Sequence, residues 1–140
     1  MVEIEVAYLG QLRCSAKHGP SGMLLTTDAP VDNKGRGEAF SPTDLVATAL
    51  GTCMLTLMGI RAGEQGIPLD GTQLSVKKHM VSSPLRRIAQ LEVGIRVPHG
   101  AEISAAGRAV LEHAARTCPV RLSILEAIEV PLRFDWADPR

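Results

Sequence analysis

Aromatic side chains are scarce in this 140-residue sequence, which has two Phe, one Tyr and one Trp. The core must therefore be built mainly from Leu, Ile, Val, Ala and Met, which supply few large anchors. The chain also lacks an excess of charge, because 15 Lys and Arg balance 15 Asp and Glu. This balance argues against a partner such as nucleic acid, whose binding normally needs a net basic surface. The basic cluster Lys77–His79 with Arg86 and Arg87 fits a solvated hairpin better than a binding patch.

Signals for export or membrane insertion are missing as well. The first residues, MVEIEVAYLG, contain no apolar signal-peptide core. The apolar run Leu45 to Ile60 is short and interrupted by Gly and Thr, so we expect it not to span a bilayer. We therefore expect a cytoplasmic protein with no membrane partner. Its length fits a single domain over residues 1–140 with a sizeable core.

Cysteine is limited to three residues, and no CxxC motif is present. The four histidines are scattered without the spacing of metal ligands, so we expect neither a metal nor another cofactor. A Cys–His hydrolase is also disfavoured, because His113 lies five residues before Cys118 and would point elsewhere on a helix. In a reducing compartment the thiols are then either catalytic or simply buried, and both interpretations remain open.

The hydrophobic pattern predicts an α+β fold with antiparallel sheets. Strands with alternating apolar residues are expected at 2–9, 12–17, 23–27, 72–81, 86–97 and 128–134, and a second helix at about 103–116. The polar stretch 28–37 reads as a loop.

One long helix has the clearest start signal in the chain. Ser41 is a good N-cap, Pro42 suits the first helical position, and Asp44 completes a capping box. The helix should run to about Glu64 and end at Gly66. It is apolar on nearly every side, which predicts a central helix that is buried all round, with a partner subunit covering one side.

The two cysteines on predicted helices differ in context. Cys53 lies in the middle of the long helix, where a free Cys is most simply a small buried hydrophobe. Cys118 precedes Pro119 and would cap a short helix at 120–125, where unpaired N–H groups stabilise a thiolate. Cys14 lies on one face of the predicted strand at 12–17, which favours a structural role for it.

Two segments around these cysteines resemble the signature regions of the OsmC/Ohr family, the osmotically inducible and organic hydroperoxide resistance proteins. They are FSPTDLVATALGTCMLTLMGIRA at 40–62 and LEHAARTCPVRLSI at 111–124. HGPSGMLLTTDAP at 18–30 and VPLRFDW at 130–136 are similar to the OsmC-like branch. The resemblance extends over nearly the whole chain. The two cysteine motifs are specific for the family when both are present, and either motif alone is a weak signal.

The resemblance implies an intertwined α+β homodimer that reduces organic hydroperoxides with an external dithiol. It makes Cys53 the attacking thiol, oxidised to a sulfenic acid, and Cys118 the thiol that resolves it as a disulfide. It also implies an arginine that stabilises the thiolate, for which Arg13 is the best match. The family's glutamate, ten residues before the first cysteine, is replaced here by Thr43.

Neighbouring acids do not obviously replace that glutamate. Asp44 is rotated by about 100° around the helix relative to Thr43 and has a role as a cap. Glu38 lies upstream in the loop, and the sequence does not place it. Our leading hypothesis is a thiol-dependent hydroperoxide reductase. The alternative is a non-catalytic binding module of the same fold for a small apolar ligand, in which both cysteines are core residues.

Overall fold

The computed structural model describes residues 1–137, which form two compact units. The first comprises Met1–Val46 and the second Ala47–Arg140, of which residues 138–140 lie outside the described part. The boundary falls inside helix α1 (Pro42–Gln65), so the first turn of this helix belongs to the first unit. The expectation of one domain over 1–140 stays a prediction.

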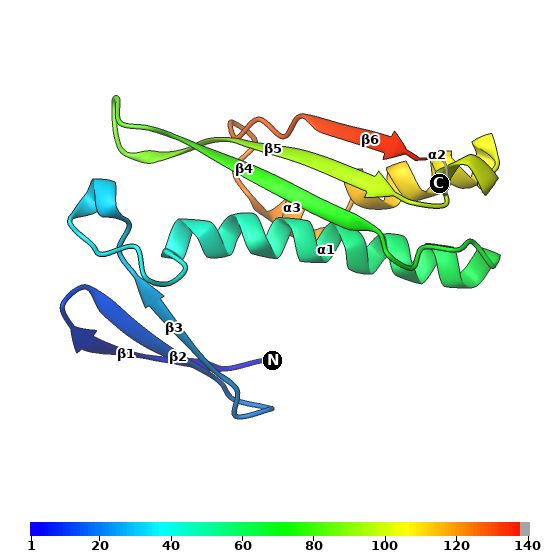
Figure 1. Ribbon diagram of the computed structural model, residues 1–140. Coiled ribbons are helices and arrows are strands. Elements are labelled where there is room, and N and C mark those ends of the chain that lie inside the picture. The colour runs from blue at the N-terminus through cyan, green and yellow to red at the C-terminus, as the bar shows by residue number, and fades with distance from the viewer. Residues whose placement is uncertain (138–140) are drawn as a thin grey trace. The chain divides into compact units, whose positions relative to one another are not determined.

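The first unit contains a three-stranded antiparallel sheet with the order β1-β2-β3 (Figure 1). The strands span Ile4–Gly10, Arg13–His18 and Leu24–Asp28, close to the predicted ranges. A loop with one short 3-10 turn at Val31–Asn33 follows β3.

Helix α1 begins and ends where the sequence predicts. The Asp44 N–H donates to Ser41 Oγ at 3.1 Å, and the Ser41 N–H donates to the Asp44 carboxylate at 2.9 Å. This reciprocal pair is the capping box expected from the sequence. At the other end, Gly66 takes a left-handed conformation and the Ile67 N–H donates to the Ala62 carbonyl at 2.9 Å. That closure satisfies carbonyls that the helix itself leaves without a donor.

The second unit contains a sheet with the order β4-β5-β6, in which β4 spans Gln73–Val81, β5 Arg87–Val97 and β6 Leu132–Trp136. Strands β4 and β5 form the expected antiparallel hairpin. Strand β6 starts four residues later than predicted and pairs with β5 in parallel. The expectation of purely antiparallel sheets is therefore wrong for this strand, because α2 (Ala105–Arg116) and α3 (Pro119–Ser123) return the chain to the start of β5.

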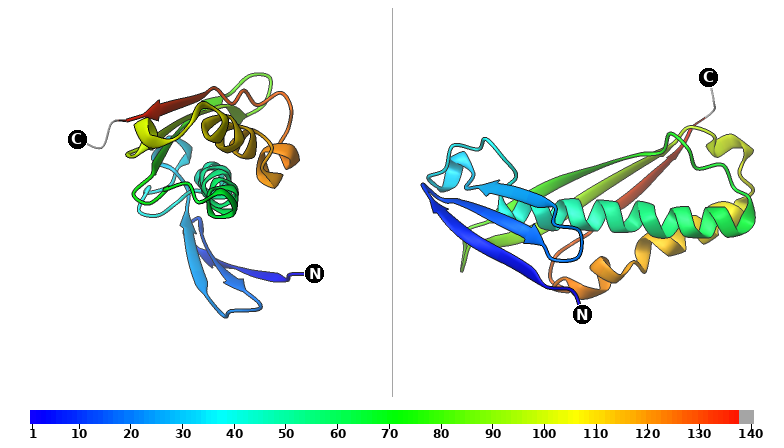
Figure 2. Two further views of the ribbon diagram at one scale, coloured as in Figure 1. Left: turned by 90° about the vertical axis from the view of Figure 1, so that its right-hand side faces the viewer. Right: turned by 90° about the horizontal axis from the view of Figure 1, so that it is seen from below.

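The helices of the second unit cover one face of this sheet (Figures 1 and 2). α1 approaches β4 closely at Gly51, where an added Cβ would lie 2.7 Å from Leu74 Cδ2 and 3.3 Å from Val76 Cγ2. The buried residues of α1 recur every three to four positions and face the sheet: Ala47, Leu50, Gly51, Met54, Met58 and Ala62. The rest of the helix is half-buried or exposed, so within one chain it is not buried all round.

Helix α1 has 24 residues, a mean hydropathy of 1.6 over its most apolar window and a composition that would allow it to cross a membrane. The expectation that this run is too short is therefore wrong, because the helix extends beyond the apolar run at both ends. The core helix of a globular protein passes the same test, and the buried stripe against β4 is what such a helix shows.

Candidate redox site at Cys53 and Cys118

The second unit brings Cys53 and Cys118 together. Cys53 lies in α1, one residue before the fully buried Met54, and Cys118 is the N-cap of α3. The two thiols form a hydrogen bond, and the two cysteines also interact electrostatically. Both are free cysteines in this structure. Two residues that are 65 positions apart in the sequence are thus placed within reach of each other by the fold.

The start of α3 explains how Cys118 is oriented. Pro119 occupies the first helical position, as the sequence predicts, and the Arg121 N–H donates to Cys118 Sγ at 3.4 Å. Burial raises the pKa of the Cys118 thiol because it penalises the thiolate, and the Cys53 thiol raises that pKa further. The hydrogen bond from Arg121 acts in the opposite direction and is outweighed. The structure therefore favours Cys118 as a neutral thiol in the reduced state.

The two cysteines differ in access. Cys118 has no exposed surface, whereas Cys53 is half-buried. A thiol that attacks a substrate must meet it, and a thiol that resolves an oxidised partner needs only to reach that partner. Exposure therefore suits Cys53 to the attacking role and Cys118 to the resolving role.

Arg13 lies in the first unit, directly opposite Asp28 in the pairing of β2 with β3. Its guanidinium forms an ion pair with the Asp28 carboxylate at 3.5 Å and a second ion pair with Glu38. Asp28 is 1% exposed and accepts a hydrogen bond from the Glu38 N–H at 3.1 Å. Two carboxylates therefore fix Arg13 within its own unit. Its expected action on Cys53 stays a prediction, and Cys14 lies beside it on β2, half-buried.

The structure shows which partners the acidic residues near the start of α1 have. Asp44 is occupied by the capping box, as expected. Thr43 Oγ1 lies 3.2 Å from Ser41 Oγ in the same turn. Glu38, which the sequence does not place, is the acid that pairs with Arg13. Asp28 is missed by sequence reasoning, although the pairing of β2 with β3 would have put it opposite Arg13.

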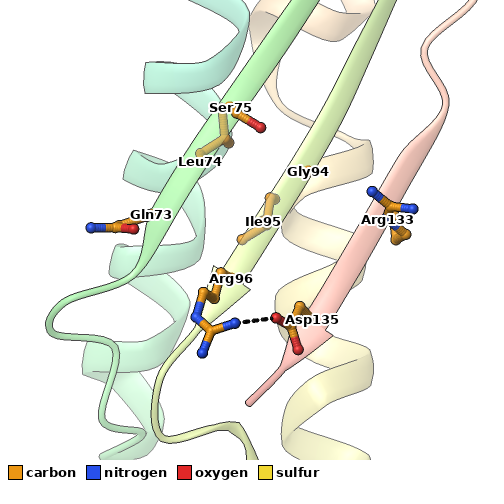
Figure 3. Close-up of a pocket in the computed structure, with 8 residues that line it drawn as sticks. All are labelled: Gln73, Leu74, Ser75, Gly94, Ile95, Arg96, Arg133 and Asp135. Atoms are coloured by element: carbon orange, nitrogen blue, oxygen red, sulfur yellow. Dashed lines mark hydrogen bonds and ion pairs between the residues drawn. The ribbon is translucent and has the colours of Figure 1, made fainter.

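A hollow lies elsewhere, on the outer face of the β4-β5-β6 sheet (Figure 3). It has a volume of about 630 Å³ and is open at Gly94, where β5 presents no side chain. Neighbouring positions alternate between the two faces of a strand, so Ser75 and Gly94 point away from the face that α1 covers. Neither cysteine lines this hollow. Within residues 1–137, no three His, Cys, Asp or Glu side chains cluster as a metal site would require.

Within residues 1–137, two three-stranded sheets, one long helix and the pairing of a half-buried thiol with a buried one define an α+β protein with a candidate thiol redox site. The chain belongs to the family of OsmC-like proteins, whose pattern matches residues 35–133 and so includes both cysteines. The OsmC/Ohr resemblance seen in the sequence is therefore confirmed, and so is the α+β fold class.

Solved structures support the same assignment. A protein of Psychrobacter arcticus, described as a candidate osmotic stress induced and detoxification response protein, is 42% identical, with 96% of each chain covered and a TM-score of 0.88. An organic hydroperoxide resistance protein OsmC of Legionella pneumophila is 17% identical over 96% of each chain, with a TM-score of 0.71. The organic hydroperoxide resistance protein OhrB of Bacillus subtilis is 13% identical, with 96% of this chain and 97% of that chain covered and a TM-score of 0.67. The last two likenesses concern the fold alone. None of the functionally curated proteins compared with the chain is similar to it.

Proposed function

We propose that this protein is a cysteine-based peroxidase that reduces organic hydroperoxides to alcohols. The observation that carries the proposal is the contact between the half-buried Cys53 thiol and the buried Cys118 thiol. Membership of the family, in which some proteins of this fold are called organic hydroperoxide resistance proteins, supports it.

The chemistry needs two thiols and one external reductant. The Cys53 thiolate attacks the terminal oxygen of the hydroperoxide, the O–O bond breaks, and the alkoxide takes a proton and leaves as the alcohol. Cys53 is then a sulfenic acid. The Cys118 sulfur attacks the Cys53 sulfur, water leaves, and a Cys53–Cys118 disulfide forms. An external dithiol restores both thiols by two exchange steps and becomes a disulfide itself.

Arg13 is proposed to stabilise the Cys53 thiolate through its positive charge. Its pairs with Asp28 and Glu38 hold the guanidinium in a defined place within the first unit. We propose that Glu38, which pairs with Arg13, supplies from an earlier position in the chain the carboxylate that is missing at Thr43. We further propose that the protein acts in the cytoplasm as a homodimer.

Peroxide consumption in the presence of a dithiol tests the proposal. Wild type should consume cumene hydroperoxide, Cys53→Ser should lose the activity, and Cys118→Ser should accumulate a sulfenic acid at Cys53 that a dimedone probe traps. Cys14→Ser is the matched control and should keep the activity. A Cys53→Ser protein as active as wild type would contradict the peroxidase. A slow-reacting Cys53 that never forms the disulfide would favour the non-catalytic binding module instead.

A further inference from the structure

The middle strand of the second unit's sheet carries a glycine that the fold itself does not require. Gly94 of β5 lies between Ser75 of β4 and Arg133 of β6 in the strand pairing, on the outer face of the sheet (Figure 3). Its backbone φ is not positive, and an added Cβ would meet only Ser75 Oγ, at 3.4 Å, which is an ordinary contact. A glycine inside a strand weakens that strand, and it often marks a place where a ligand approaches the backbone closely.

The missing side chain leaves two adjoining hollows open over the sheet. One has a volume of about 630 Å³ and the other of about 280 Å³, and both are lined by Ser75, Gly94 and Arg133. Gln73 lines the larger hollow and Gln90 the smaller one. The larger hollow falls within the size range of small-molecule sites, roughly 300–1,000 Å³. We call the two hollows together the Gly94 groove.

Arg133 brings a positive charge to this groove that no acid neutralises. Among residues 1–137 its guanidinium forms neither an ion pair nor a hydrogen bond. The acids that line the groove are engaged elsewhere, because Asp135 pairs with Arg96 at 2.7 Å and Glu92 with Lys77 at 3.9 Å. A guanidinium without a carboxylate partner attracts an anion, with which it can form paired hydrogen bonds.

The other free groups around Gly94 are neutral and form hydrogen bonds. Ser75 Oγ and the side-chain amides of Gln73 and Gln90 have no hydrogen-bond partner in the part of the chain that the structure describes. They can therefore bind oxygen atoms of a ligand. A nucleic-acid backbone would need an extended row of cations, which one free guanidinium does not provide. The set suits a small anion that also carries hydroxyl groups.

We propose that the Gly94 groove binds a small polar anion, with its carboxylate or phosphate group on Arg133, a hydroxyl group on Ser75 and its body over Gly94. The groove is separate from the thiol pair, because neither cysteine lines either hollow and Gly94 points away from the face that α1 covers. This binding function therefore does not depend on the proposed peroxidase.

Heteronuclear NMR titrations of the whole chain test the groove, with glycerol phosphate, glycerate and glycerol as probes. At least one of the two anions should shift the Gly94 amide and the Arg133 side-chain signals saturably, with a Kd of about a millimolar or tighter. The anion that binds more tightly identifies the preferred head group, and glycerol should cause no such shift. The absence of a saturable shift with both anions, or an equal response to glycerol, would overturn the inference.

Side-chain variants test the two proposed contacts. Arg133→Gln should weaken binding of the anion about tenfold, because it removes a charged hydrogen bond, and Ser75→Ala about threefold. Arg61→Gln is the matched control, because Arg61 pairs with Glu64 on α1 and lines neither hollow. Equal affinity in Arg133→Gln and Arg61→Gln would contradict the proposed site. Cys53→Ser should bind the anion as wild type does, and a loss of binding there would place the probe at the thiols instead.

The glycine itself is tested by filling the groove. Gly94→Val suits a strand and should abolish binding of the anion by occupying the space over the backbone. Gly94→Ala should raise the melting temperature, because alanine loses less conformational freedom on folding and its Cβ meets only an ordinary contact. A Gly94→Ala protein less stable than wild type would show that the fold requires the glycine and would contradict the inference. Unchanged binding of the anion by Gly94→Val would contradict it as well.

Discussion

At the scale of single residues, Cys118 is the best-defined part of the candidate site. Its backbone begins α3, its sulfur accepts the Arg121 N–H, and its thiol meets that of Cys53. A helix N-terminus alone would favour the thiolate, as the sequence suggests. Burial is the stronger effect here and raises the pKa of this thiol. The hydrogen bond at the start of α3 thus lowers the pKa of Cys118, whereas burial raises it, and burial has the larger effect.

The raised pKa of Cys118 predicts a loss of stability in alkaline solution. Below the ordinary value near 9.0 the thiol is neutral in the folded and unfolded states, and stability does not depend on its titration. Above that value the unfolded chain loses this proton more readily than the folded protein does, so the free energy of unfolding falls as pH rises. Cys118→Ser keeps a capping oxygen and does not titrate in this range. Urea unfolding at a series of pH values should show a steeper alkaline loss for wild type. Parallel curves would contradict the assignment.

At the scale of elements, local chemistry determined α1 almost to the residue. The capping box and the Gly66 closure use only neighbouring residues, which is why the sequence predicts both ends. Strand β6 was less predictable. Its start and its parallel pairing depend on α2 and α3 carrying the chain back to β5, which no local pattern encodes.

The close approach of α1 to β4 at Gly51 gives a prediction at this scale. Gly51→Val would force its side chain into Leu74 and Val76 and should lower the free energy of unfolding by about 1–3 kcal/mol. Gly63→Val is the matched control, because nothing lies within 4 Å of a Cβ at Gly63 in the same helix. Its effect should stay within about 0.5 kcal/mol. Denaturant unfolding measures both, and equal effects would contradict the close packing.

At the scale of the whole molecule, much apolar surface is exposed in one chain. In the first unit Ile4 is 52% exposed, Val6 66% and Tyr8 67%, and they alternate along β1. Ile60 of α1 is 51% exposed. A small sheet without a covered hydrophobic face is marginally stable in water, so a second copy of the chain is the proposed cover.

A homodimer is therefore the expected state in solution. Light scattering coupled to size-exclusion chromatography should give twice the 15.0 kDa mass of the chain. Val6→Asp should shift the mass toward that of one chain, because it would place a charge in the apolar surface to be covered. Lys17→Asp, which changes an exposed charged side chain of β2, is the control for an added acid. A monomeric wild type at all concentrations would contradict the dimer.

The sequence by itself determined the parts that depend on neighbouring residues. These are the strands of the hairpins, the limits of α1 and the cap at Cys118, because periodicity and capping act over a few positions. Tertiary structure decided what depends on distant residues: the contact of Cys53 with Cys118, the pairing of Glu38 with Arg13 and the burial that raises the pKa of Cys118. Each of these needs side chains that are 25 or more positions apart to meet, and only the packed fold brings them together.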